Sequence, residues 1–106
     1  MVKKSIIDIA IRYLKQIPDD MDVKRAYLFG SYAKGLDKEH SDIDIALVLG
    51  NMPDFFSAQM QLMRIRRKVD LRIEPHPIGD SEFTDLDPFV HEIRKSGIEI
   101  SLSDER

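Results

Sequence analysis

Residues 43–49 are apolar at every position except Asp44, and this run constrains the fold more than any other feature of the chain. A strand with apolar side chains on both faces must be covered on both faces, so it lies inside a sheet. With 106 residues and 42% hydrophobic content, the chain can bury one sizeable core. We therefore expect a single domain over residues 1–106, an α/β fold of the α+β type in which helices flank a small mixed sheet.

Helical and extended patterns alternate along the rest of the chain. Apolar residues at three- and four-residue steps indicate helices, and short apolar or alternating runs indicate strands. The third strand is expected to stop at Pro75 and Pro77, because proline cannot donate to a sheet ladder. In the second helix, the stripe of Phe56, Met60 and Met63 is expected to face the core. The expected elements are helices over 5–16, 55–68 and 88–96 and strands over 24–29, 43–49, 69–74 and 98–102.

Three carboxylates are expected to meet at one end of the sheet. A helix joins the second and third strands, so a right-handed crossover makes them parallel and brings their first residues to the same end. Asp42 and Asp44 lie two positions apart and share a face of the second strand. Asp70 begins the third strand, and Glu74, lower on that strand, is the lesser candidate for the third carboxylate.

Carboxylates packed this closely repel one another unless a cation lies between them. The chain has no cysteine, and hard oxygen donors favour Mg²⁺ or Mn²⁺. Two such ions can clamp the attacking and leaving oxygens of a phosphoryl displacement. If the first strand is antiparallel to the second, Gly30 and Ser31 reach the same end of the sheet. There glycine permits close approach and helical N–H groups bind phosphate, so we expect a site for a nucleoside triphosphate.

One arrangement of residues resembles a known family signature. Gly30-Ser31, ten intervening residues and Asp42-x-Asp44 resemble the signature of the DNA polymerase beta-like nucleotidyltransferase superfamily, and the wider strings GSYAKG and SDIDI match it. In size the chain looks like the minimal nucleotidyltransferases, the antitoxin halves of HEPN/MNT toxin–antitoxin pairs. The resemblance implies the nucleotidyltransferase fold, a contact of Ser31 with the triphosphate, and two Mg²⁺ ions on Asp42 and Asp44. It also implies a third carboxylate that helps to activate the acceptor, a role that falls on Asp70.

The implied function is magnesium-dependent transfer of AMP from ATP to an acceptor, with release of pyrophosphate. The resemblance suggests a tyrosine of a HEPN toxin as the acceptor, which would make the reaction a protein AMPylation. Because a chain of this length has no room for a second domain, the acceptor is expected to dock from outside. Two alternatives stay open. One is a non-catalytic antitoxin that covers its toxin, and the other is a transferase for an aminoglycoside-like small molecule, for which a homodimer could supply the acceptor lobe.

Charge and hydropathy narrow the range of partners. The chain carries 16 Lys and Arg against 19 Asp and Glu, a net charge of -3, which does not indicate broad binding to nucleic acid. Asp8 and Arg12 interrupt the apolar residues near the start, so neither a signal peptide nor a membrane span is expected. The lack of cysteine is typical of a reducing compartment, and we expect a cytoplasmic protein.

Other polar residues near the expected site have simpler explanations beside a functional one. Lys34 follows the Gly-Ser turn and is assigned to the phosphates, with a solvated loop lysine as an equal alternative. His40 could act on the acceptor side, although most loop histidines are merely exposed, and Ser41 is expected to cap the turn. His76 is expected to be structural because it lies at the far end of its strand from the metal ions, and His91 is expected to be structural as well.

Overall fold

The sheet of the computed structural model, which describes residues 2–102, has four strands in the order β3-β2-β1-β4. The strands are β1 (Val23–Phe29), β2 (Ile43–Leu49), β3 (Ile73–Gly79) and β4 (Ile98–Ile100). The helices are α1 (Lys4–Gln16), α2 (Ser31–Lys34), α3 (Phe55–Ile65) and α4 (Pro88–Ser96). Short 3₁₀ turns lie at Asp19–Met21, Arg66–Lys68 and Asp80–Glu82. Within residues 2–102, no helix has the length and apolar character of a membrane span.

β2 lies inside the sheet, as its composition predicts. It pairs with β1 in antiparallel and with β3 in parallel orientation, so the sheet is mixed. Every residue of β2 is buried except Asp44, which is partly exposed. Because β1 runs toward the end of the sheet at which β2 and β3 begin, the turn after β1 also reaches that end. The expected mixed fold and its parallel crossover are confirmed.

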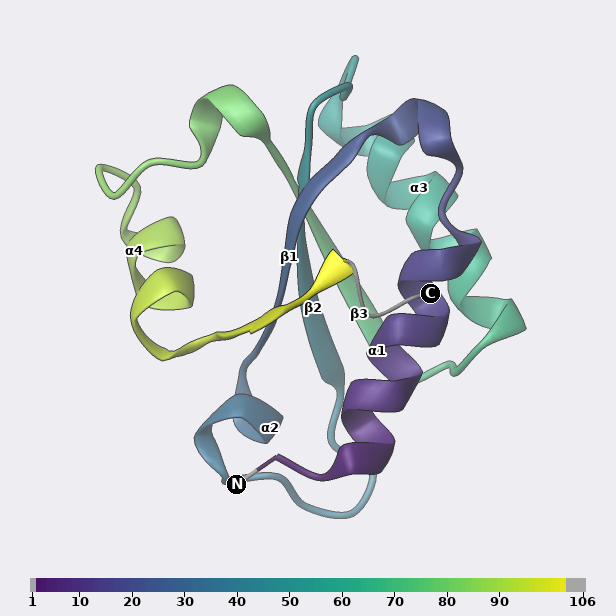
Figure 1. Ribbon diagram of the computed structural model, residues 1–106, viewed down its shortest axis with the longest axis vertical. Helices are drawn as coiled ribbons and strands as arrows, with labels where there is room; N and C mark the ends of the chain where they lie inside the picture. Colours follow the sequence, from purple (N-terminus) through teal and green to yellow (C-terminus); the bar gives the residue numbers. More distant parts are fainter. Residues whose placement is uncertain (1, 103–106) are drawn as a thin grey trace.

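Helices cover both faces of the sheet, with α1 and α3 on one face and α4 on the other (Figure 1). Leu47 of β2 packs in the cluster under α1 and α3, whereas Val48 packs with α4. Asp44 lies four residues before Val48 on the same strand, and residues an even number of positions apart point to the same face. The Asp44 side chain therefore points to the α4 face. Tyr13 of α1 donates its hydroxyl hydrogen to the backbone carbonyl of Leu62 in α3 at 2.8 Å, which ties these two helices together. Burial raises the pKa of Tyr13 and keeps this donor protonated.

β3 corrects the sequence-based expectation for the third strand. It begins at Ile73 instead of residue 69 and continues through Pro75 and Pro77. The physical reason is that β3 is an edge strand, paired only with β2 among the described strands. The backbone of Arg72 is directed at β2, because its carbonyl accepts a hydrogen bond from the Ile43 N–H at 2.8 Å. By alternation the nitrogens of both prolines point to the open edge, where no ladder hydrogen bond is required.

The buried face of α3 differs from the stripe of Phe56, Met60 and Met63 that was expected to face the core. Its buried residues are Ala58 and Leu62, one turn apart. Phe56 is 72% exposed and Met60 is 42% exposed. The side chain of Asp54 accepts a hydrogen bond from the Ser57 N–H at 2.8 Å and so caps the helix start. The face that meets the sheet is the neighbouring one, with Ala58 and Leu62, whereas Phe56 and Met60 face outward and Met63 is half-buried.

We predict that Leu62→Ala lowers the free energy of unfolding by about 2–5 kcal/mol, because Leu62 is fully buried and its truncation leaves a cavity. Phe56→Ala is the control on the same helix, and its exposed ring should contribute less than about 0.5 kcal/mol. Urea unfolding followed by circular dichroism measures both variants. If Phe56→Ala lowered the free energy of unfolding more than Leu62→Ala does, the Phe and Met stripe would be the buried face after all.

Candidate active site

The turn after β1 has a backbone conformation that requires glycine. Gly30 has φ 78° and ψ -153°, a region that is essentially closed to residues with a side chain. A Cβ at Gly30 would also overlap the Oδ2 atom of Asp44. Ser31 begins the short helix α2, whose first N–H groups have no partner within the helix. The turn therefore presents backbone N–H donors directly beside a carboxylate.

Asp44 lies between the two neighbouring strands at the start of β2. Its register partners are Phe29 of β1 and Glu74 of β3. Its Oδ1 atom is 3.2 Å from Nε2 of His76, and the His76 ring packs edge-on against the Phe29 ring with centroids 4.9 Å apart. The carboxylate of Asp44 is thus held between the glycine turn on one side and β3 on the other. Asp42 lies just before β2 and is exposed.

The expectation that His76 lies far from the site is wrong, because its Nε2 atom is 3.2 Å from Oδ1 of Asp44. Because β3 begins four residues later than expected, His76 pairs with Ala46 and reaches Asp44 from the same face of the sheet. The parallel pairing of β2 and β3 agrees with the sequence-based expectation, and the continuation of β3 through Pro75 and Pro77 aligns His76 with Ala46.

Asp70 does not lie on β3 but in the loop before it. Its carboxylate accepts three hydrogen bonds from Arg72: from the backbone N–H at 2.9 Å, from Nε at 3.1 Å and from Nη2 at 2.9 Å. These bonds lower the pKa of Asp70. Nη1 of Arg72 also donates to the Tyr32 hydroxyl of α2 at 3.3 Å. Asp70 thus takes part in a bridge between the loop and α2, whereas Glu74 is the carboxylate that lies opposite Asp44.

The other polar residues singled out from the sequence lie around this centre. Lys34 pairs with Glu92 of α4 at 3.5 Å, and both side chains are about half exposed. His40 has φ 70°, is exposed, and lies 3.8 Å from a carboxylate oxygen of its neighbour Glu39. Ser41 caps its turn as expected, because its hydroxyl oxygen accepts a hydrogen bond from the Lys38 N–H at 2.8 Å. His91 is exposed on α4.

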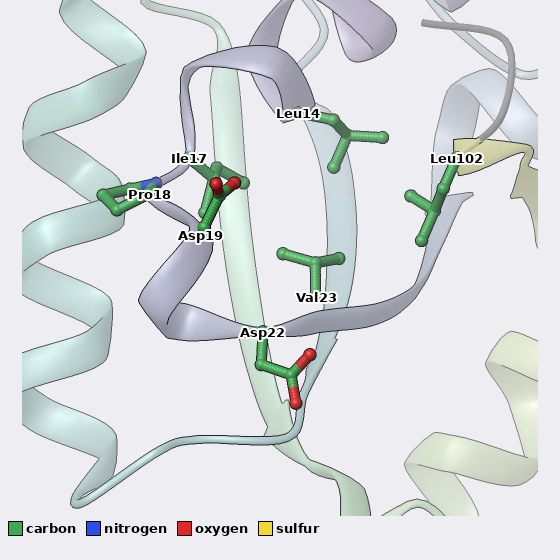
Figure 2. Close-up of a pocket in the computed structure, with 7 residues that line it drawn as sticks. All are labelled: Leu14, Ile17, Pro18, Asp19, Asp22, Val23 and Leu102. Carbon is green, nitrogen blue, oxygen red and sulfur yellow. The ribbon is translucent and has the colours of Figure 1, made fainter.

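A cavity of about 220 Å³ lies away from this centre (Figure 2). It surrounds the start of β1, whereas the Gly-Ser turn follows the end of that strand. Its walls include Leu14, Val23 and Leu102, and one of its carboxylates, Asp22, already pairs with Lys24 at 3.1 Å. We assign no chemistry to this cavity.

The chain matches the family described as "Polymerase beta, Nucleotidyltransferase" over residues 13–106. It belongs to this nucleotidyltransferase family. Two proteins of Methanocaldococcus jannaschii are similar to it, and each is named "Putative protein adenylyltransferase". It is 31% identical to MJ0141 over 100 residues, covering 90% of this chain and 98% of the relative. It is 40% identical to MJ1215 over 70 residues, covering 62% of this chain and 81% of the relative.

The fold of this nucleotidyltransferase is also found among solved structures. A crystal structure of a toxin-antitoxin with AMP-PNP superposes with a TM-score of 0.61 at 22% identity, and the match covers 93% of this chain and 77% of that one. A likeness at this level of identity shows a shared fold. The fold expected from the sequence is therefore confirmed.

The family implies a nucleotide substrate and, typically, divalent metal ions. In residues 2–102, no three His, Cys, Asp or Glu side chains lie close enough together to hold a metal ion. Asp42, Asp44 and Asp70 do not form such a group there, and the oxygens of Asp70 accept hydrogen bonds from Arg72. Asp42 and Asp44 still fit Mg²⁺ as a pair. They supply hard oxygen donors, and no hydrogen bond or ion pair joins Asp42 to another described residue, so its oxygens can bind an ion that takes water and phosphate as its remaining ligands.

We predict that Gly30→Ala destabilises the nucleotidyltransferase by about 1–3 kcal/mol or displaces the Asp44 carboxylate, because both the backbone angles and the added Cβ are unfavourable. Gly35→Ala is a matched control, since Gly35 has φ 73° but no atom within 4 Å of an added Cβ. Its expected cost is about 1 kcal/mol. Urea unfolding of both variants compares them, and equal losses would show that the overlap with Asp44 has no energetic consequence.

Proposed function

We propose that this nucleotidyltransferase transfers AMP from ATP to a protein acceptor, a tyrosine of a HEPN toxin, and acts as the antitoxin of that pair in the cytoplasm. The observation that carries the proposal is the contact of the Asp44 carboxylate with Gly30, which places an acidic group beside a turn suited to phosphate. The names of the two relatives support protein adenylylation. The similar structure is a toxin-antitoxin with an ATP analogue, which supports both the partner and the nucleotide.

The β1 side of the site would hold the triphosphate. Gly30 leaves room for a phosphate to approach the backbone, and the first N–H groups of α2 would donate to its oxygens. The Ser31 hydroxyl, at the first residue of α2, would add a further donor. Lys34 would leave its exposed partner Glu92, a weak ion pair, to neutralise phosphate charge.

Asp42 and Asp44 would hold Mg²⁺, with two ions expected by analogy with the family and Mn²⁺ as a substitute. When bound, the metal would offset phosphate charge and polarise the α-phosphate. His76 would keep the Asp44 carboxylate in place through its Nε2 contact at 3.2 Å. The acceptor, a separate protein in this proposal, would reach the site from outside residues 1–106.

The third carboxylate has two candidates, Asp70 and Glu74. Asp70 was favoured by the sequence, but three hydrogen bonds from Arg72 already occupy its oxygens. Glu74 lies opposite Asp44 in the parallel ladder, and one donor, Nη1 of Arg66, contacts it at 3.0 Å. This placement supports Glu74 as the group that helps to activate the acceptor hydroxyl.

Asp44→Asn tests the enzymatic proposal. We expect AMP transfer to fall at least about 100-fold, because the amide removes the charge that binds the metal while the fold is retained. Transfer from α-labelled ATP to a candidate HEPN toxin of the same genome, followed by intact mass, measures the effect. Asp20→Asn, an exposed carboxylate before the start of β1, is the control and should be fully active. Undiminished transfer by folded Asp44→Asn protein would remove the enzymatic proposal and favour steric binding of the toxin.

Parallel variants of the two other carboxylates decide the third position. We expect Glu74→Gln to lower single-turnover transfer by about 10²- to 10⁴-fold with little change in nucleotide affinity. Asp70→Asn should instead lower stability by about 1 kcal/mol with near-normal transfer, because it weakens the bonds to Arg72. The reverse pattern would assign the role to Asp70, and this experiment therefore distinguishes the two directly.

A further inference from the structure

A groove of about 510 Å³ lies on the β3 side of the sheet, between the beginnings of α3 and α4. Its aromatic walls are Phe55 and Phe89, which are 58% and 43% exposed. His76 and Met52 also line it, and Glu82 and Asp87 contribute carboxylates. None of the roles proposed for the phosphates or the metal uses this space.

The groove is continuous with the proposed active site through His76. That side chain lines the groove and also lies 3.2 Å from Oδ1 of Asp44. The Phe89 ring lies beside it, with its centroid 6.0 Å from that of His76 and 5.5 Å from that of Phe29. A ligand in the groove would therefore have one end beside the carboxylate that is proposed to hold the metal.

The geometry of phosphoryl transfer determines from which side of the sheet the attacking hydroxyl would approach the phosphorus. β1 and β3 flank β2 on opposite sides, and the Gly30 turn that would hold the leaving phosphates belongs to the β1 side. In an in-line displacement, the attacking and leaving oxygens lie on opposite sides of the phosphorus. The attacking hydroxyl must then arrive from the β3 side, where His76 and the groove lie.

We propose that this groove binds the acceptor tyrosine, with basic residues flanking that tyrosine in the partner protein; this inference rests on the function proposed above. Phe55 and Phe89 suit an aromatic ring, which packs favourably edge-on or offset against other rings. Glu82 and Asp87 would attract flanking lysine or arginine side chains. Asp87 also caps α4 by accepting from the Phe89 N–H at 2.8 Å, which fixes the aromatic wall in place.

In the reaction, the phenolic oxygen of the bound tyrosine forms a bond to the α-phosphorus of ATP. The bond between that phosphorus and the oxygen bridging to the β-phosphate breaks, and its electron pair leaves with pyrophosphate. The phenolic proton passes to the Glu74 carboxylate, the group proposed above to activate the hydroxyl, and from there to water. The groove contributes by placing the phenolic oxygen at its His76 end, in line with the leaving group.

Titrations followed by amide chemical shifts test the groove in the full chain. The probe is a blocked tripeptide with tyrosine between two lysines, and the comparison is the same tripeptide with two glutamates. We expect the lysine peptide to give saturable shifts at Phe55, His76 and Phe89, and the glutamate peptide to bind several-fold more weakly. Phe55→Ala should raise the Kd of the lysine peptide about three- to tenfold. Phe56→Ala is the matched control, an exposed ring next in sequence that does not line the groove, and should leave the Kd unchanged.

A separate titration with Mg²⁺ and ATP keeps the two proposals distinguishable. Shifts at Gly30 and Ser31 support the nucleotide site whatever the peptide does, and their absence argues against the proposed function itself. The groove proposal is overturned if the lysine peptide gives no saturable shifts at the groove, or if Phe55→Ala and Phe56→Ala affect its Kd equally. It is also overturned if Phe55→Ala weakens binding of ATP instead, since the groove would then hold the nucleobase.

Discussion

The contact between Gly30 and Asp44 depends on one strand pairing, and the rest of the site is arranged around it. The antiparallel ladder of β1 and β2 places Phe29 opposite Asp44, so the next residue of the chain must pass the carboxylate. Only a residue without a side chain can do so at φ 78°. A register shift of one residue would turn Asp44 toward the apolar face under α1 and α3 and remove it from the turn. The buried residues on both faces of β2 prevent that shift, so the core itself holds the site together.

The position of Asp44 near the start of β2 allows a charged side chain in a strand that is otherwise buried. The strand is covered on both faces, and an uncompensated carboxylate at its centre would be strongly destabilising. Asp44 is the second residue of the strand, where the end of the sheet leaves its side chain 24% exposed and within reach of His76. Asp42, two residues earlier, is outside the strand and exposed. The pair therefore spans the boundary between the core and solvent, the position at which the proposed Mg²⁺ would be held.

Much of the fold follows from patterns in the sequence, because those patterns report burial directly. The apolar run of β2 defines its bounds, its interior position and the need for helices on both faces. The Gly-Ser turn and the Asp-x-Asp pair could be brought together once β1 was taken as antiparallel to β2. The bounds of β3 do not follow in this way: Pro75 and Pro77, which would end an interior strand, are tolerated at its edge position, and the strand begins at Ile73 and not at residue 69. That shift of four residues explains why His76 was placed far from the site and Asp70 beside it. Sequence periodicity also does not choose between two neighbouring faces of α3, because both faces carry apolar residues.

The same prolines restrict how a partner can approach the β3 side. An exposed edge strand ordinarily offers N–H and carbonyl groups to which another chain can add a strand. On β3, the outward positions include Pro75 and Pro77, which have no N–H to donate, so a partner cannot form a continuous ladder there. Recognition on this side must therefore rely on side chains. The side chains available are the aromatic and acidic walls of the groove beside His76, so this edge would favour the side-chain docking proposed for the acceptor.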